Sequence, residues 1–429
     1  MTKISFYSII NKVTFCTLKT QEISMTNIES DRKKIVRQIL DRGIVTGVLP
    51  DTEAFIERLS SETPMRIYIG ADPTSTALHL SHAKNYMLLE EFRSLGHEVI
   101  VLFGDFTARI GDPTDRATAR KQLSNEEVRA NVSKWLEQIK PLMNFDAKVN
   151  PPLVKFNADW LAKLSMEDVV HLASQVTVQQ MLERDMFEKR LKEEKPIHLH
   201  EFLYPLMQGF DSVAMEVDAE LCGTDQTFNA LMGRTLLRNI KRKDKFVVTV
   251  NLMENPKTGE LMSKSRGTGV FLDTNAFDKY GSIMAQPDEM IEVILINNTR
   301  IPLADIAKIM SMSNLRDAKM RAAFEVTRIF HGEDAAVEAQ ERFVQLVQMK
   351  GPAENIPEVS IKWQSPTLFS ILRECLTDDI SNNEIQRLID QGSIKIDGEK
   401  MTDRGQILTL LPDGCILKVG KKQWFRVVP

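Results

Sequence analysis

A strand that runs directly into a helix, over residues 66–95, constrains the fold of this chain more than any other feature of its sequence. Alternating side chains over 66–71 predict a short strand, a polar turn follows at Asp72-Pro73-Thr74, and apolar residues recur at helical spacing from His79 to Leu95. In open parallel α/β sheets, ligands bind at such turns because free N–H groups and the helix dipole attract anions. The stretch therefore predicts an α/β domain with a phosphate site.

Two histidines, His79 and His82, lie three residues apart in the first turn of that helix, so both imidazoles project from one face toward the crevice. A histidine at a helix start is usually a cap or a surface residue, and a pair at this spacing is also half of a metal site. No Cys, Asp or Glu stands at ligand spacing within that turn. The sequence therefore favours phosphate over metal, and we expect no tightly bound metal.

The composition is that of a soluble globular protein. Its 429 residues suggest about two to four domains. No apolar run approaches the roughly 20 residues that a membrane helix needs, so we expect no membrane contact. The net charge of −4 does not exclude an RNA partner, since a local basic patch suffices. Widely spaced cysteines argue against a disulfide framework or a zinc cluster and suit the reducing cytoplasm; they are Cys16, Cys222, Cys375 and Cys415.

Three further apolar runs, 98–104, 219–223 and 246–253, predict strands buried in the same parallel sheet. A helical, Met- and Leu-rich stretch at 154–191 is typical of a dimer interface, an inserted lid or plain core packing, and these alternatives stay open. Residues 1–30 are assigned no fold: they resemble a transit peptide without arginine, and a start at Met25 explains them at least as well.

Polar residues that follow these strands are candidates for a pocket. Three of them, Tyr204, Gln208 and Asp211, form one stripe of a helix predicted at about 200–217, among large apolar side chains. After the strand 219–223, Gly223 allows close backbone approach and Asp225 is placed to bind a ribose, although a GxGxxG loop is absent and a Rossmann dehydrogenase is disfavoured. The alternatives to a binding pocket are a solvent-exposed helix face and ordinary turns.

The loop at 254–270 carries a glycine-flanked lysine, Lys264, with a hydroxyl on either side. Such a lysine in a mobile loop suits a clamp on polyphosphate, although surface lysines are common and the loop alone is weak support. Together with the histidines it indicates a polyphosphate site.

These motifs together resemble the bacterial-type tyrosyl-tRNA synthetases, which are class I aminoacyl-tRNA synthetases. HLSH at 79–82 matches the signature His-Ile-Gly-His, and LMSKS at 261–265 matches Lys-Met-Ser-Lys-Ser, with Ser81 and Leu261 as departures. The resemblance covers about Ile35 to the C-terminus. The tyrosyl branch is suggested by YIGADPT at 68–74, IGDP at 110–113, YPLMQGFD at 204–211 and CGTDQ at 222–226.

The resemblance implies a Rossmann-like parallel-sheet catalytic domain at 31–285, with a helical insertion and dimer region at about 155–200. It also implies an α-helical anticodon-side domain at 286–350, a linker at 351–365 and a small α+β alpha-L RNA-binding domain at 366–429. It further implies that tyrosine attacks ATP, which enters with Mg²⁺, to give tyrosyl-adenylate and pyrophosphate. The tyrosyl group then passes to the 3′-terminal ribose of tRNA(Tyr), in a cytoplasmic homodimer.

The resemblance also assigns roles to individual residues. The phosphates would be bound by Thr74, His79, His82 and Lys264, and the rest of the nucleotide by Gly70, Asp72, Gly223 and Asp225. The ammonium of tyrosine would meet Asp112, Tyr204 and Gln208, its carboxylate Gln226, and its phenolic hydroxyl Tyr68 and Asp211. A site built to bond that hydroxyl leaves buried polar groups unpaired when phenylalanine enters, and we see no additional domain of editing size.

The last 64 residues predict two short helices and three small strands with basic side chains. These would form the phosphate-binding patch of the RNA-binding module, unless they are simply a solvated mixed-charge surface; they are Arg387, Lys395, Lys418, Lys421, Lys422 and Arg426. Two rival functions stay open. One is another class I enzyme, such as a tryptophanyl type, and the other is a non-catalytic RNA-binding relative, for which Leu261 is the only hint.

Overall fold

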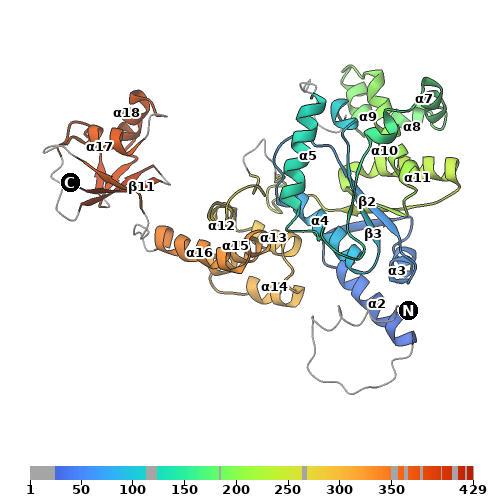
Figure 1. The fold of residues 1–429 in the computed structure, drawn as a ribbon, viewed down its shortest axis with the longest axis horizontal. Coiled ribbons are helices and arrows are strands. Elements are labelled where there is room, and N and C mark those ends of the chain that lie inside the picture. Colours follow the sequence, from blue (N-terminus) through green and yellow to red (C-terminus); the bar gives the residue numbers. More distant parts are fainter. Residues whose placement is uncertain are drawn as a thin grey trace. The chain divides into compact units, whose positions relative to one another are not determined.

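The computed structural model divides the chain into two compact units, up to Gly332 and from Glu333 onward (Figure 1). The helical region expected at 286–350 is thus split between them. The structure describes residues 25–112, 123–182, 185–262, 268–348, 356–361, 366–376, 380–397, 399–407, 414–420 and 423–428. The predictions on 1–24 lie outside these residues, but helix α2 begins at Met25, so the segment without an assigned fold is shorter than expected.

A six-stranded sheet forms the centre of the first unit. Its order is β1 (Val45–Leu49), β6 (Phe246–Val250), β5 (Ala219–Gly223), β2 (Arg66–Ala71), β3 (Glu98–Phe103) and β4 (Leu153–Phe156). All neighbours are parallel except β1, which pairs antiparallel with β6. The four central strands were predicted. The sequence analysis missed β1 and β4 because both are edge strands without a buried apolar run.

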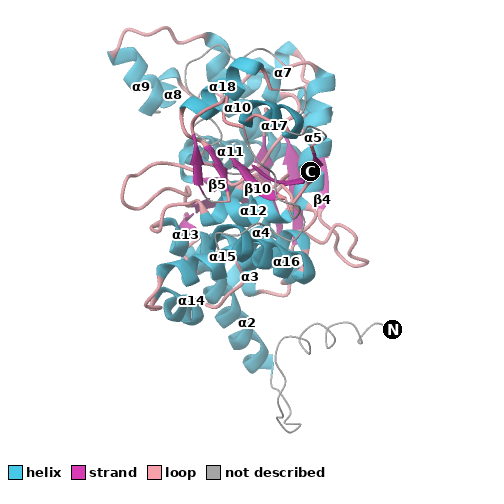
Figure 2. Ribbon diagram, turned by 90° about the vertical axis from the view of Figure 1, so that its left-hand side faces the viewer, coloured by secondary structure: helices cyan, strands magenta, loops and turns pink. Residues whose placement is uncertain are grey.

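The strand order reverses beside β2, and this places the ligand crevice. The chain passes from β2 to β3 and β4, then returns to β5 on the other side of β2, where Tyr68 pairs with Glu220. The carboxyl ends of β2 and β5 therefore flank the switch point at which such sheets bind ligands. Helices α4 (Leu80–Ser94) and α11 (Thr227–Lys241) follow these two strands and cover opposite faces of the sheet (Figure 2).

The remaining helices of the first unit surround this frame. Helix α10 packs on α11, α13 packs on α4, and α12 packs on α15. Among the described residues, no helix is long and apolar enough to span a membrane. The helices not yet given bounds are α2 (Met25–Leu40), α3 (Thr52–Ser60), α5 (Asn125–Ile139), α6 (Ala158–Leu161), α7 (Met166–Ala173), α8 (Val178–Leu182), α9 (Asp185–Lys192), α10 (Leu199–Met215), α12 (Ala276–Met284), α13 (Met290–Asn298), α14 (Leu303–Met310) and α15 (Leu315–His331), with 3-10 turns η1 (Thr107–Arg109) and η2 (Thr224–Gln226).

The second unit contains α16 (Glu333–Phe343), a π-helical turn η3 (Val344–Gln348) and a five-stranded sheet with two helices, α17 (Leu368–Cys375) and α18 (Asn382–Asp390). The strand order is β7 (Glu358–Ser360), β11 (Gln423–Val428), β10 (Cys415–Val419), β8 (Ile394–Ile396) and β9 (Glu399–Met401).

The linker expected at 351–365 needs a correction, because part of it belongs to this sheet. Strand β7 pairs parallel with β11, and Ile361 is buried in the core beneath the sheet. A three-residue edge strand is too short to give a periodic signal, so the sequence analysis read it as linker. The folded C-terminal module therefore begins at or before Glu358.

Candidate active site

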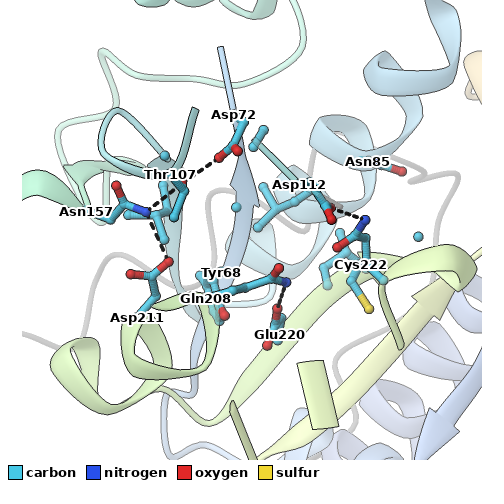
Figure 3. A pocket seen from close by; sticks show the side chains of 18 of the residues that line it. Tyr68, Asp72, Asn85, Thr107, Asp112, Asn157, Gln208, Asp211, Glu220 and Cys222 are labelled. Atoms are coloured by element: carbon cyan, nitrogen blue, oxygen red, sulfur yellow. Dashed lines mark hydrogen bonds between the residues drawn. The ribbon is translucent and has the colours of Figure 1, made fainter. Parts of the chain in front are cut away.

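A cavity of about 290 Å³ opens at the carboxyl ends of β2 and β5 (Figure 3). Its walls come from β2, β5, α4, α10 and the loops between them, so the sheet order brings together residues that are far apart in sequence. Eleven residues that the sequence analysis selected line it: Tyr68, Gly70, Asp72, Thr74, His82, Asp112, Tyr204, Gln208, Asp211, Gly223 and Gln226.

Two other selected residues, His79 and Asp225, lie beside the cavity rather than in its wall. The ring of His79 is 4.0 Å from that of His82, centroid to centroid. Asp225 is exposed, and its carboxylate lies so close to Gly223 that a Cβ there would come within 2.4 Å of Asp225 Oδ1. Glycine at 223 thus makes room for a carboxylate at the end of β5.

The loop lysine, Lys264, lies outside the described residues, but both flanks of its loop are defined. On the exit side, Leu80 N–H donates to the Val270 carbonyl at 3.0 Å and Leu272 N–H to the Leu78 carbonyl at 2.9 Å. The loop thus returns along the histidine segment. The segment that follows the loop is also fixed by the fully buried Lys279, whose ammonium donates to the carbonyls of Phe271 and Leu272 at 2.8 and 3.0 Å.

The two histidines are held neutral by burial. Desolvation lowers the pKa of His79 to about 4 and that of His82 to about 3. The backbone N–H of His79 donates to His82 Nδ1 at 3.2 Å, so neutral His82 carries its proton on Nε2. His82 therefore offers an N–H donor at the start of α4, rather than a full positive charge.

One end of the cavity presents groups that suit a hydroxyl. The side chain of Tyr68 is 1% exposed, and its hydroxyl lies 3.0 Å from Ser212 Oγ. Asp211 accepts from Trp160 Nε1 at 2.7 Å and from Asn157 Nδ2 at 3.4 Å. Burial raises the pKa of Asp211 well above its ordinary value, while these two donors oppose the shift.

The carboxylate of Asp72 is fixed in place by two hydrogen bonds. It accepts from Tyr204 OH at 2.8 Å and from Thr107 Oγ1 at 2.7 Å. Asn157 Nδ2 donates to Thr107 Oγ1 at 3.0 Å, and Figure 3 shows Thr107 and Asn157 linking Asp72 to Asp211. The sequence assigned Tyr204 and Asp72 to different parts of the ligand, but in the structure their side chains are hydrogen-bonded to each other.

A chain of side-chain amides crosses the cavity floor. Gln226 Nε2 donates to Asp112 Oδ2 at 2.8 Å, and Asn229 Nδ2 donates to the side-chain oxygens of Gln226 and Gln208, both at 2.9 Å. Gln208 Nε2 in turn donates to Glu220 Oε1 at 3.1 Å. The predicted polar residues are thus oriented by partners that the sequence analysis did not select.

The missed residues are Asn85, Thr107, Asn157, Trp160, Ser212, Glu220, Asn229 and Lys245. Asn157 follows β4, so recognising that edge strand would have found it. Glu220 and Lys245 carried a signal, because a charge inside or beside a buried apolar strand requires a partner. Nothing in the local pattern marks the other residues.

The cavity can therefore hold an elongated ligand with three kinds of group. Tyr68 and Asp211 face one end, while Asp72 and Asp112 make its middle attractive to a cation. The start of α4 supplies donors for an anion. Among the described residues, no group of three or more His, Cys, Asp or Glu side chains is arranged to hold a metal ion.

The chain is similar in sequence to several known proteins. A family model described as tRNA synthetases class I (W and Y) matches residues 60–348. The tyrosine–tRNA ligase of Moorella thermoacetica is 38% identical over 405 residues, covering 92% of this chain and 96% of that protein. That of Thermotoga maritima is 39% identical over 396 residues, covering 91% and 96%.

A solved structure also shares the fold. The C-terminally truncated mitochondrial tyrosyl-tRNA synthetase of Aspergillus nidulans superposes with a TM-score of 0.62 at 22% identity. The match covers 75% of this chain and 100% of that one.

Proposed function

This chain belongs to the family of the tyrosine–tRNA ligases, among the class I tRNA synthetases, and we propose that its cavity joins tyrosine to ATP and then to tRNA(Tyr). The observation that supports tyrosine as the amino acid is that Tyr68 and Asp211 both lie at one end of the cavity. These two polar groups, buried at one end of the cavity, suit a phenol and not an indole or a benzyl ring.

The site residues then take definite roles. Tyr68 and Asp211 hold the phenolic hydroxyl. The carboxylate of Asp112, with Tyr204 and Gln208, surrounds the ammonium, and Gln226 lies near the carboxylate. The phosphates of ATP meet Thr74, His79, His82 and Lys264, while Gly70, Asp72, Gly223 and Asp225 contact the rest of the nucleotide.

The reaction requires no protein nucleophile. The substrate carboxylate attacks the α-phosphate of ATP, pyrophosphate leaves, and the ribose hydroxyl of the tRNA then attacks the adenylate. The protein supplies positioning and stabilises charge on the phosphates. Neutral His82 does so as an Nε2–H donor, and Mg²⁺ would arrive with the ATP phosphates.

A homodimer through the 155–200 region fits the exposed surface. Large apolar side chains are unusually accessible there, which is typical of a covered interface: Met166 is 78% exposed, Val170 61%, Val178 65%, Leu191 59% and Leu199 80%. We also propose that the C-terminal module binds the tRNA through Arg387, Lys395, Lys418 and Arg426, together with Lys421 and Lys422, which lie outside the described residues. The enzyme would act in the cytoplasm.

Amino-acid-dependent pyrophosphate exchange tests the proposal. We expect exchange of label into ATP with tyrosine and none above background with tryptophan. Exchange with tryptophan alone would refute the assignment of substrate. Binding of tRNA without any adenylate at saturating tyrosine and ATP would make the chain a non-catalytic relative.

A further inference from the structure

A fully buried lysine, Lys245, lies directly behind the hydroxyl end of the cavity and has no role in the function proposed above. Its ammonium forms an ion pair with Glu220 and donates to Ser212 Oγ at 2.7 Å. It also lies 5.6 Å from the centroid of the Tyr68 ring. A buried ammonium is costly unless it is paired and hydrogen-bonded, and both conditions are met here.

The neighbouring helix makes room for this ammonium. A Cβ on Gly233 of α11 would lie 2.8 Å from both Lys245 Nζ and Ser212 Oγ. Any larger residue at 233 would push the lysine away from the serine. The contact between Lys245 and Ser212 therefore depends on a glycine at this point of the helix.

The chemistry of these groups fixes the direction of one hydrogen bond: an ammonium can only donate, so Ser212 Oγ accepts from Lys245. The proton of Ser212 is then available for the other partner of its Oγ, the hydroxyl of Tyr68 at 3.0 Å, where either oxygen can be the donor. When the Tyr68 oxygen accepts from Ser212, Tyr68 is able to turn its own proton toward the cavity.

The groups near this proton are two carboxylates, Glu220, whose hydrogen bond with Tyr68 also raises the pKa of Tyr68, and Asp211. Glu220 already accepts from Gln208 on Oε1 and from Lys245 on Oε2. Asp211 accepts from Trp160 and Asn157. Burial and the negative charges of Glu220 and Asp211 raise the pKa of Tyr68, so that its hydroxyl stays protonated.

We propose that Lys245 and Ser212 form a relay that fixes Tyr68 as a hydrogen-bond donor to the phenolic oxygen of the substrate. This inference rests on the proposed function and makes both relay members positioning residues for specificity. Asp211 accepts a hydrogen bond from the phenolic hydroxyl of the substrate. The site then offers one donor and one acceptor, which a phenol matches with its single proton and its lone pairs.

Loss of the relay would change which ligand the site matches. Without the ammonium, the lone pair of Ser212 that Lys245 occupied becomes available to Tyr68, so the tyrosine proton turns away from the cavity more readily. The ligand then faces two acceptors, Tyr68 and Asp211. A phenol can satisfy only one of them, whereas the aromatic amine of 4-aminophenylalanine has two N–H groups and satisfies both.

Pyrophosphate exchange with tyrosine and with 4-aminophenylalanine tests the relay in the full-length protein. In Lys245→Met, we expect the ratio of kcat/KM for 4-aminophenylalanine to that for tyrosine to rise by about tenfold. Ser212→Ala removes the donor to the Tyr68 oxygen and leaves the Tyr68 proton free to turn to Glu220, so it should raise the same ratio, while the Lys245–Glu220 ion pair is kept. Ser282→Ala, which removes a partly exposed hydroxyl on α12, is the matched control and should leave the ratio unchanged.

The outcomes separate the relay from the proposed function. Equal losses for both amino acids, with a constant ratio in both variants, would show that Lys245 and Ser212 serve packing alone and would overturn the relay. Absence of tyrosine-dependent exchange in the unaltered protein would instead refute the proposed function, since the relay acts only on substrate choice.

Discussion

At the scale of single residues, the site works through groups whose protonation is set by burial. His79 and His82 are kept neutral, and Tyr68 and Tyr204 are kept protonated, because a charge in this cavity would lose its hydration. Donors and acceptors are thereby fixed before any ligand enters. Such preorganised dipoles stabilise a transition state without reorganisation during the reaction.

Replacement of Asp211 should weaken the choice of tyrosine. In Asp211→Ala, the phenolic proton loses its acceptor, and Trp160 Nε1 loses its partner. We expect kcat/KM for tyrosine to fall by about 100-fold, with a much smaller change for phenylalanine. Exchange kinetics with both amino acids measure this. Asp159→Ala removes an exposed carboxylate nearby and should change neither, whereas unaltered kinetics in Asp211→Ala would mean that the pocket is assigned wrongly.

Another buried histidine, His97, should make the protein less stable in acid. Its Nδ1 accepts from Met65 N–H at 3.1 Å and its Nε2 lies 2.8 Å from the Leu59 carbonyl, so the ring is neutral. Burial lowers the pKa of His97 to about 4, whereas an unfolded histidine takes up a proton below about 6.5. Between these values the unfolded state binds more protons, and acid therefore favours unfolding.

The expected loss from His97 is about 1.4 kcal/mol of unfolding free energy per pH unit as the pH falls from 6.5 to 4. Urea unfolding at pH 7.5 and pH 5 measures it. His97→Gln preserves a donor and an acceptor but cannot titrate, so its stability should depend less steeply on pH. His79 and His82 are present in both proteins and cancel in the comparison; equal slopes would contradict the assignment.

At the scale of elements, the site depends on the close packing of α10 against α11. Helix α10 carries Tyr204, Gln208 and Asp211, and α11 carries Asn229. A Cβ on Gly209 would lie 2.9 Å from Leu236 Cδ1 and 3.2 Å from the backbone nitrogen of Gly233. Glycines therefore set the distance between the helices that position the amino-acid pocket.

The substitution Gly209→Ala should force these helices apart. We expect a loss of about 1–3 kcal/mol of unfolding free energy, together with a lower kcat/KM for tyrosine. Gly281→Ala on α12 is the matched control, since its Cβ would meet no atom within 4 Å and alanine favours a helix. Urea unfolding of the two variants gives the comparison, and a Gly209→Ala protein as stable as Gly281→Ala would show that the interface yields without cost.

At the scale of the whole molecule, the division after Gly332 separates the cavity from the C-terminal sheet. All described residues that line the cavity belong to the first unit. Because the described cavity lies within the first unit, we expect the first reaction step to be independent of the second unit.

Removal of Glu333–Pro429 should spare adenylate formation and weaken charging of the tRNA. The deletion must start before β7, because a deletion from 366 onward would leave β7 and Ile361 in the protein without the sheet on which they pack. Pyrophosphate exchange reports the first step, and transfer of labelled tyrosine to tRNA reports the second. Equal loss in both assays would show that the second unit is structural support for the first.

The sequence by itself determined the central strands, the helix starts and eleven of the cavity residues. The strands and their polar turns follow from local rules, since a buried strand needs a continuous apolar run and a ligand turn needs polar residues and glycine at its end. Other cavity residues, such as Asp112 and Gln226, were selected through the family resemblance. The family resemblance, which the comparisons confirm, likewise rests on short motifs read along the chain.

Only the tertiary structure decided how those residues bond to one another. Tyr204 and Asp72 are 132 positions apart, and Tyr68 and Ser212 are 144 apart. Such pairs meet because the strand order reverses beside β2, which no local period encodes. The edge strands β1, β4 and β7 were missed because they lack a buried run, and Lys245 acquired its place behind Tyr68 only when β6 and α11 packed around it.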